Sequence, residues 1–302
     1  MCFEKNNGNN KKIDKGVYSM ANIFVTGATG LIGTRLTERL VQEGHHMAGF
    51  TTSERGRQKL EQLGAEGFIG NILDKSTIEA AISRFQPDVI MHQITDLKNV
   101  DMAANTKVRI EGTRHLVDVA EKYGVTHIIS QSLAFMYAPG DTLADENTPL
   151  DRASEGDRKI TVDGVIGVEE ESARLPHFVV LRYGMMYGPG TWFGKDGMIY
   201  NQFKEGNVTQ SKGITSFVHI DDTVEAAVHA LTLPSGIYNV VDDEPVDGET
   251  WAQWYAQQLK VDPEIEYTEA APFERGASNS KYKTQEGTLR YPSWKDGMRD
   301  LS

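Results

Sequence analysis

Short apolar runs alternate with longer amphipathic stretches along most of the chain. Short apolar runs fit buried strands, whereas apolar residues that recur every three or four positions fit one buried face of a helix. After residue 30, Ile32, Leu36 and Leu40 recur in this way, and we expect Gly44 to end that helix. The strands that the pattern predicts are residues 22–26, 46–51, 67–69, 88–93, 126–131, 178–183 and 236–241.

The order of these elements predicts the class of fold. A second long helix is expected over residues 106–124, where Gly124 would stop it. Strands that alternate with helices imply right-handed crossovers and therefore a parallel sheet covered by helices on both faces. The alternation weakens after residue 194, the end of LRYGMMYGPGTWFG, and from there on Trp, Pro and loop-forming residues are more frequent. We therefore predict an α/β fold, a doubly wound parallel sheet followed by a smaller C-terminal region.

Composition and charge exclude several classes of protein. The 302 residues carry a formal net charge of −12, which disfavours binding to nucleic acid or to an anionic membrane. Cys2 is the single cysteine, so a disulfide framework is impossible and a cytoplasmic location is expected. The polar residues 1–19 lack the apolar core of a secretory signal, and we interpret them as a disordered leader. The scattered histidines show no zinc-binding spacing, so no metal is expected.

A glycine-rich loop stands between the first predicted strand and the first predicted helix. Gly27, Gly30 and Gly33 follow one another at intervals of three residues. In that context the first glycine allows a tight turn, the second lets backbone amides approach a diphosphate, and the third lets the helix pack against the strand. The positive end of the helix dipole would then face the phosphates. The alternative is an ordinary glycine-rich turn.

Several motifs, in order along the chain, carry a resemblance to a known family. They are TGATGLIG, GNILDKSTIEAAI, DVIMHQITD, RIEGTRHLVDVAEKYGVTHIISQS, VVLRYGMMYGPGT and FVHIDD. Over residues 20–300 the chain resembles the short-chain dehydrogenase/reductase superfamily, in its extended branch of NAD-dependent epimerases and dehydratases. The resemblance implies a Rossmann domain over residues 20–185 that residues 217–241 rejoin. It also implies a substrate-binding region over residues 186–302, a small-molecule substrate and a possible homodimer.

The identity of the dinucleotide depends on the end of the second strand. An acidic residue there would bind the ribose 2′-hydroxyl of NAD, but Thr51, Thr52 and Ser53 occupy these positions and Arg55 follows. Hydroxyls and arginine suit a 2′-phosphate, so NADP(H) is preferred and NAD(H) remains possible. The alternative is that these cations belong to a solvated start of a helix. The expected cofactor-binding residues are Gly27, Thr29, Gly30, Leu31, Ile32, Gly33, Thr52, Ser53, Arg55, Asn71, Ile72, Gln93, Ile94, Thr95, Ser130 and Tyr183.

The usual catalytic pair of the family is missing from its expected place. Members usually carry Tyr and Lys four residues apart on the helix before the sixth strand, where Tyr exchanges a proton beside the nicotinamide. In this chain the matching positions are Val162 and Ile166, or Thr161 and Val165. The sequence therefore resembles a divergent, mostly bacterial subgroup that lacks the pair.

Three other residues are candidates for the chemistry. Tyr137 follows the fifth strand, Ser132 neighbours Leu133 at the usual Ser or Thr position, and Arg109 replaces an Asn on the preceding helix. The alternatives are a packing role for Tyr137 and a helix-face ion pair for Arg109. We expect an NAD(P)-dependent oxidoreductase or epimerase-like enzyme that acts on a small carbonyl or sugar-like substrate with non-standard proton transfer. The alternative is a non-catalytic NADP(H)-binding sensor or scaffold.

Overall fold

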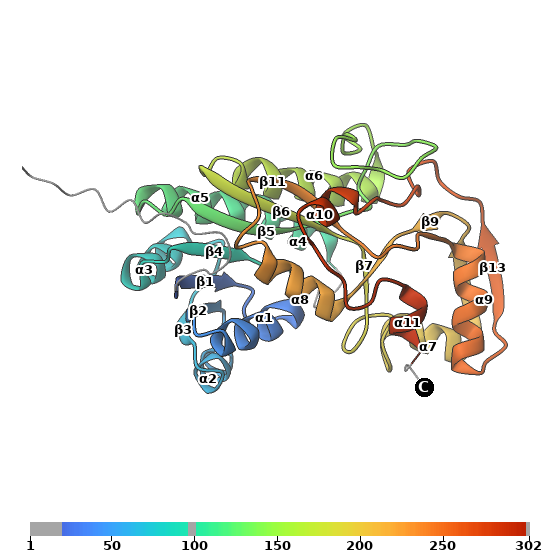
Figure 1. Ribbon diagram of the computed structural model, residues 1–302, viewed down its shortest axis with the longest axis horizontal. Helices are drawn as coiled ribbons and strands as arrows, with labels where there is room; N and C mark the ends of the chain where they lie inside the picture. The colour runs from blue at the N-terminus through green and yellow to red at the C-terminus, as the bar shows by residue number, and fades with distance from the viewer. Residues whose placement is uncertain (1–19, 96–100, 300–302) are drawn as a thin grey trace, which may run out of the picture.

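A seven-stranded parallel sheet forms the centre of the molecule (Figure 1). The computed structural model describes residues 20–95 and 101–299, so the expected leader lies outside the described residues. The strand order is β3-β2-β1-β4-β5-β6-β11, and the predicted doubly wound α/β fold is confirmed. The strands are β1 (Asn22–Thr26), β2 (His46–Thr51), β3 (Glu66–Ile69), β4 (Val89–His92), β5 (His127–Leu133), β6 (His177–Tyr183) and β11 (Gly236–Val240). All seven predicted strands are confirmed, with ends shifted by no more than two residues.

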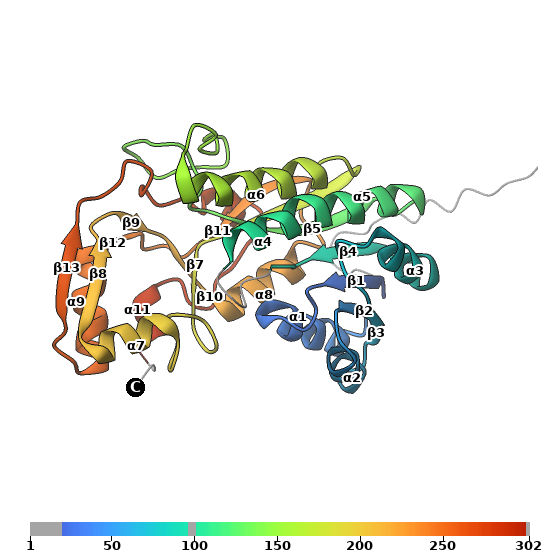
Figure 2. The same cartoon turned by 180° about the vertical axis from the view of Figure 1, so that it is seen from behind.

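Helices cover both faces of this sheet (Figures 1 and 2). One face carries α1 (Leu31–Gln42), α2 (Glu54–Gln62) and α8 (Ile220–His229), and the predicted stripe of Ile32, Leu36 and Leu40 is buried against it. The other face carries α3 (Lys75–Phe85), α4 (Met102–Lys107), α5 (Thr113–Lys122) and α6 (Gly156–Ser172). Strands buried on both faces read as continuous apolar runs, which is why the sequence predicted them well.

The helix expected over residues 106–124 differs from the expectation. It begins at Met102 and consists of α4 and α5 joined by η1 (Val108–Gly112), a π-helical turn. The hydroxyl of Thr113 donates to the carbonyl oxygen of Arg109 within this turn. Gly124 follows the last turn with a φ of 73°, a left-handed conformation that glycine adopts readily. The turn covers only five residues, which is too short a stretch for a change of apolar period to be read from the sequence.

The C-terminal part of the chain packs at the far end of the molecule from α2 and α3 (Figures 1 and 2). Its elements are β7 (Met185–Tyr187), α7 (Met198–Glu205), β8 (Asn207–Ser211), β9 (Ile214–Thr215), β10 (Phe217–His219), β12 (Val246–Asp247), α9 (Gly248–Leu259), β13 (Glu264–Thr268), α10 (Ser280–Thr284) and α11 (Trp294–Met298). Phe217, Trp251, Tyr255 and Trp294 belong to an aromatic core of its own. The domain boundaries stay a prediction. Within residues 20–95 and 101–299, no helix combines the length and apolar character of a membrane span.

Candidate functional site

The glycine turn lies at the carboxyl end of β1, beside β4, where the strand order reverses. Gly27 has a φ of 70°, and a Cβ there would lie 2.6 Å from the carbonyl oxygen of Gln93. A Cβ on Gly33 would lie 2.2 Å from the carbonyl oxygen of Gly27. Gly30 differs: it is exposed, its backbone is extended, and a Cβ would meet only the oxygen of Gly27, at 3.1 Å. The fold therefore requires glycine at 27 and 33, whereas Gly30 keeps an outer surface open.

The N-terminus of α1 presents backbone amides at this surface. Gly30 caps the helix without a side-chain hydrogen bond, and the first helical bond runs from Thr34 N to Gly30 O. The amides of Leu31, Ile32 and Gly33 therefore have no acceptor within the helix. Thr29 and Leu31 are half-buried beside the turn, and Ile32 is anchored in the core. Free amides at the positive end of a helix are a suitable site for a diphosphate.

Gln93, at the end of β4, supplies a second feature that fits a dinucleotide. Its side chain is 5% exposed, and neither amide atom has a hydrogen-bonding partner among the described residues. An unsatisfied buried amide costs about 1–3 kcal/mol, which a polar ligand would relieve. Ile94 and Thr95 follow, half-buried, at the same edge. The residues present therefore fit a dinucleotide whose diphosphate lies on α1.

The expected adenine-binding residues lie after β3. Asn71 is exposed, and its Oδ1 accepts a hydrogen bond from Leu73 N at 3.0 Å. Ile72 is buried, and a Cβ on Gly112 would lie 2.9 Å from its side chain. Asn71 and Ile72 thus lie on the β2–β3 side of the glycine turn. The order of strands would place the adenosine half of a bound dinucleotide on that side.

The end of β2 carries hydroxyls and a cation. Ser53 caps α2 by accepting a hydrogen bond from Gly56 N, and Glu54 is paired with Arg57. Thr52 and Arg55 are exposed at this helix start. The carboxylate of Glu54 is therefore directed along α2.

Ser132 and Ser130 point into the protein, toward α6. The hydroxyl of Ser132 donates to Glu169 at 2.6 Å, and the guanidinium of Arg182 donates twice to the same carboxylate, at 2.8 and 2.6 Å. Ser130 forms a hydrogen bond of 2.7 Å with Ser172. The sequence did not indicate the buried cluster of Ser132, Glu169 and Arg182, because these three residues come from separate elements.

Tyr137 and Tyr183 are buried with their hydroxyls occupied. Tyr137 donates to Asn239 Oδ1 at 2.6 Å, and the guanidinium of Arg182 lies 4.9 Å from its ring centre. Burial raises the pKa of Tyr137 to about 12. Tyr183 donates to the carbonyl oxygen of Thr223 at 3.0 Å, and burial raises its pKa as well. These contacts favour the packing and hydrogen-bonding interpretation of both residues.

The positions expected for the Tyr–Lys pair are apolar in space as well as in sequence. Val162, Val165 and Ile166 of α6 pack with Met136 in one buried cluster, and Leu133 packs against it. None of these five side chains can donate or accept a proton. The structure thus brings Leu133, at the position of the expected Ser or Thr, together with Val162, Val165 and Ile166, which are three of the four positions of the two possible pairs, and all of these side chains are hydrocarbon. The fourth position, Thr161, carries a hydroxyl and is half-buried.

Arg109 is a buried cation on η1. It is 3% exposed, its Nη2 lies 3.4 Å from the carbonyl oxygen of Gln131, and its Nε has no partner among the described residues. Burial lowers its pKa to about 10, so it stays charged at neutral pH. Burial, and then the charge of Arg109, lower the pKa of His92 to about 3. His92 is neutral and lies between the hydroxyls of Thr26, at 2.7 Å, and Thr113, at 2.8 Å.

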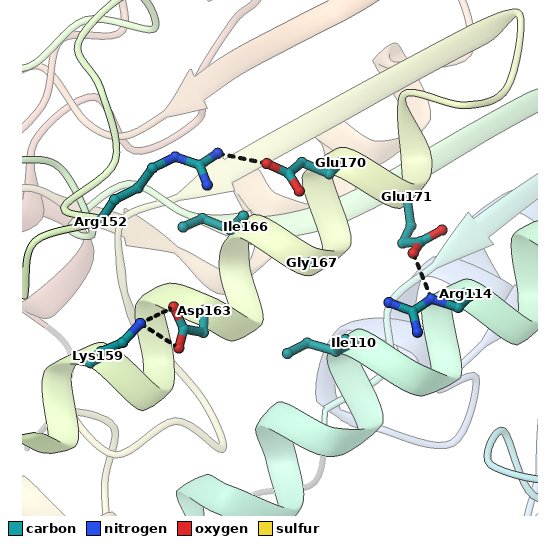
Figure 3. A pocket seen from close by; sticks show the side chains of 9 residues that line it. All are labelled: Ile110, Arg114, Arg152, Lys159, Asp163, Ile166, Gly167, Glu170 and Glu171. Atoms are coloured by element: carbon teal, nitrogen blue, oxygen red, sulfur yellow. Dashed lines mark hydrogen bonds and ion pairs between the residues drawn. The ribbon is translucent and has the colours of Figure 1, made fainter.

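A hollow of about 320 Å³ on the outer surface, between α6 and the η1–α5 segment, is separate from this site (Figure 3). Ion pairs of Arg152 with Glu170, Lys159 with Asp163 and Arg114 with Glu171 line it. Exposed pairs of this kind contribute about 0–1 kcal/mol each. Within the described parts of the chain, no group of three His, Cys, Asp or Glu residues could hold a metal ion.

The strand order, the glycine turn at the switch point and the uncapped helix define a dinucleotide-binding protein of the Rossmann type. The chain belongs to the NAD dependent epimerase/dehydratase family, whose model matches residues 23–240, and the resemblance stated above is confirmed. A 3-diazoavenalumate denitrifying reductase from Streptomyces sp is 33% identical over 91% of this chain and 98% of its own length.

Solved structures show the same fold. The enzyme WbmG of Bordetella bronchiseptica, in complex with NAD and UDP, matches with a TM-score of 0.78 and 20% identity, over 94% of each chain. The UDP-glucose 4-epimerase of Thermus thermophilus, in complex with NAD, matches with a TM-score of 0.72 and 24% identity, over 93% of this chain and 97% of its own. The family match and the reductase that is 33% identical support an enzyme of the oxidoreductase or epimerase type.

Proposed function

We propose that this chain is an NAD(P)-dependent reductase of a small organic substrate, whose reaction takes no proton from a Tyr–Lys pair. The observation that carries the proposal is the apolar cluster of Leu133, Val162, Val165 and Ile166. Reduction of a carbonyl, or epimerisation of a sugar through a ketone, needs a side chain that gives or takes a proton at oxygen. Hydrocarbon side chains cannot do this, so we infer a substrate that accepts hydride without forming an oxyanion.

A diazo compound meets this condition. The relative that is 33% identical is named as a denitrifying reductase of a diazo substrate. A diazonium cation that receives a hydride becomes a C–H compound and N₂: the C–N bond breaks with its electron pair on nitrogen, and no proton is gained or lost. The bound nicotinamide supplies the hydride. We therefore propose a small diazonium compound, or a diazo compound that reacts in its protonated diazonium form, as the class of substrate.

The residues of this chain would then bind the dinucleotide, orient the substrate beside it and exclude water. The amides of Leu31, Ile32 and Gly33 hold the diphosphate, and the unsatisfied amide of Gln93 binds next to it. Water also attacks diazonium carbon, so an apolar wall made by Leu133 and the α6 side chains would suppress hydrolysis. Tyr137 and Ser132 were predicted from the sequence as catalytic residues; in this proposal they instead support the wall, through their contacts with Asn239 and Glu169, respectively.

We further propose a preference for NADP(H). Thr52 and Arg55 are exposed at the start of α2, and Glu54 is held by Arg57 and so does not compete with a phosphate. A guanidinium beside a helix N-terminus suits a 2′-phosphate. The homodimer and the cytoplasmic location also stay predictions, which sedimentation of the purified chain and imaging of a tagged chain would test.

The test is turnover of a simple aryl diazonium carboxylate with NADPH and NADH, beside UDP-glucose and a panel of aldehydes and ketones. We expect loss of nicotinamide absorbance with the diazonium compound, and a product with hydrogen in place of N₂ rather than the phenol that water gives. With NADPH deuterated at the transferred position, deuterium should appear on that carbon. Turnover of UDP-glucose or of carbonyls, without diazonium turnover, would overturn the proposal.

The second candidate is the non-catalytic NADP(H)-binding sensor or scaffold, which the missing proton-transfer groups also favour. The same assay separates it from the reductase. Tight dinucleotide binding by calorimetry, without turnover of any substrate in the panel, would support the sensor. A Gly30→Ala protein serves as the control for turnover that does not depend on the site.

A further inference from the structure

Arg109 is a buried charge that lacks a matching partner. No carboxylate of the described residues lies within ion-pair distance of it, and its Nε has no hydrogen-bonding partner among them. Within the described part of the chain, its side chain donates only to the oxygen of Gln131, at 3.4 Å, which is long for a charged donor. A buried cation of this kind is costly unless something else satisfies it. Its setting therefore indicates a ligand with acceptor oxygens.

The local structure directs the guanidinium to a definite place. The π-helical turn η1 carries the residue, and such turns recur at functional sites. Gly164 of α6 leaves room for the side chain, since a Cβ there would lie 3.4 Å from Arg109 Cδ and 3.1 Å from Thr106 Oγ1. The residues around Arg109 thus come from η1, α6 and the ends of β4 and β5, where His92 and Gln131 lie.

The topology identifies which part of a dinucleotide meets this position. The diphosphate lies at the β1 turn, and each half of the dinucleotide lies over one half of the sheet. β2 and β3 flank one side of β1, where Asn71 and Arg55 were placed for the adenosine half. β4 and β5 flank the other side, so the nicotinamide half lies toward Arg109.

We propose that Arg109 binds acceptor oxygens of the nicotinamide riboside half of the dinucleotide, and so supplies from η1 the positive charge that a Lys at the expected position on α6 would supply. This inference rests on the proposed dinucleotide binding. Arg109 is a binding and positioning residue here: a guanidinium keeps its proton at neutral pH, so it orients the reacting ring and does not exchange protons.

The test compares two ligands by calorimetry: NADPH, and adenosine 2′,5′-bisphosphate, which lacks the nicotinamide half. We expect Arg109→Met to weaken NADPH binding about tenfold to a hundredfold, the loss of one charged hydrogen-bonding group. Binding of the bisphosphate should be unchanged. Arg109→Lys should recover part of the NADPH affinity, because the charge is kept but the reach and the fork geometry are not.

The matched control is Arg114→Met, which removes an exposed arginine five residues further along, paired with Glu171. It should leave both affinities unchanged. Equal weakening of both ligands by Arg109→Met would indicate a structural role and overturn the inference. Unchanged NADPH affinity with a raised KM for substrate would overturn it too, in favour of a substrate contact. If the unaltered protein binds no dinucleotide, the proposed function fails instead.

A second variant keeps the test decisive if Arg109→Met does not fold. Gly164→Ala keeps the charge and favours the helix, because alanine is the better helix former. Its methyl group would be tight against Thr106 Oγ1, at 3.1 Å, and would touch Arg109 Cδ, at 3.4 Å, so the stem of Arg109 loses the freedom to move toward α6. We expect an unchanged or raised Tm, weaker NADPH binding and unchanged bisphosphate binding. Full NADPH affinity in Gly164→Ala, with the crowding confirmed by a crystal structure, would count against the inference.

Discussion

Substitution of Gly30 by alanine should separate dinucleotide binding from folding. Gly30 has φ and ψ of −75° and −176°, which any residue adopts, and its added Cβ would meet only the oxygen of Gly27, at 3.1 Å. Alanine caps a helix less well than glycine, by about 0.5–1 kcal/mol, but it gains about 0.4–1 kcal/mol by restricting the unfolded chain. The two effects nearly cancel, so the free energy of unfolding should change by less than about 1 kcal/mol.

Binding should change far more. The new methyl group stands on the exposed surface where the amides of Leu31, Ile32 and Gly33 would meet a diphosphate. If two charge-assisted hydrogen bonds of about 1.5–3 kcal/mol each are lost, the loss is at least about 3 kcal/mol. This corresponds to a dissociation constant more than about 100-fold higher.

Calorimetry with NADPH measures the dissociation constant, and thermal unfolding of the same preparations measures the stability. Gly44→Ala is the matched control: Gly44 has a φ of 86° and no neighbour within 4 Å of an added Cβ. It should lose about 1–2 kcal/mol of stability through backbone strain and keep its affinity, which is the opposite pattern. Wild-type affinity in Gly30→Ala would refute the placement of the diphosphate on α1.

Three further changes test other parts of the structure. Burial raises the pKa of Asp242 to about 8, so its favourable contribution to folding is full below the unfolded pKa and is lost as pH rises toward 8. Asp242→Asn should therefore gain stability over the wild type by on the order of 1 kcal/mol per pH unit between pH 5 and 8, and parallel urea-unfolding curves would contradict this. Arg55→Ala should weaken NADPH binding at least about tenfold and leave NADH binding unchanged, while equal effects would remove the phosphate role. Glu169→Gln should cost about 3–5 kcal/mol in thermal unfolding because Arg182 stays buried beside it, and a loss below about 1 kcal/mol would mean that the pair is dispensable.

The parallel sheet could be predicted because its strands are buried on both faces. Residues 23–25 of β1 and 89–91 of β4 are entirely apolar, and such runs are visible without knowledge of their neighbours. The glycine turn was visible for a different reason. Gly27 and Gly33 are fixed by contacts within one strand–turn–helix unit, so the whole constraint lies in adjacent sequence.

The direction of side chains at the strand ends could not be predicted equally well. The sequence places Ser130, Ser132 and Leu133 at the carboxyl end of β5, but the face that each occupies depends on the register. In the structure all three side chains meet α6, where the two serines bond to Ser172 and Glu169 and Leu133 packs against the apolar cluster of Val162 and Ile166. Which residue of α6 each of them meets depends on how that helix packs on the sheet, and adjacent sequence does not contain this information. Contacts such as Ser132 with Glu169 join distant segments and leave no local signal.

The apolar positions on α6 and the buried cation on η1 have one physical explanation. Hydride transfer needs a held cofactor, and holding it requires amides and a cation, whereas a proton donor is needed only when charge develops on oxygen. In this chain Val162 and Ile166 of α6 are buried and apolar, and Arg109 on η1 is a buried cation beside that helix. A chain that had lost cofactor binding would gain nothing from a buried guanidinium that has no ion-pair partner among the described residues, and burial of such a charge is costly. The presence of Arg109 therefore favours a protein that still holds and uses a dinucleotide.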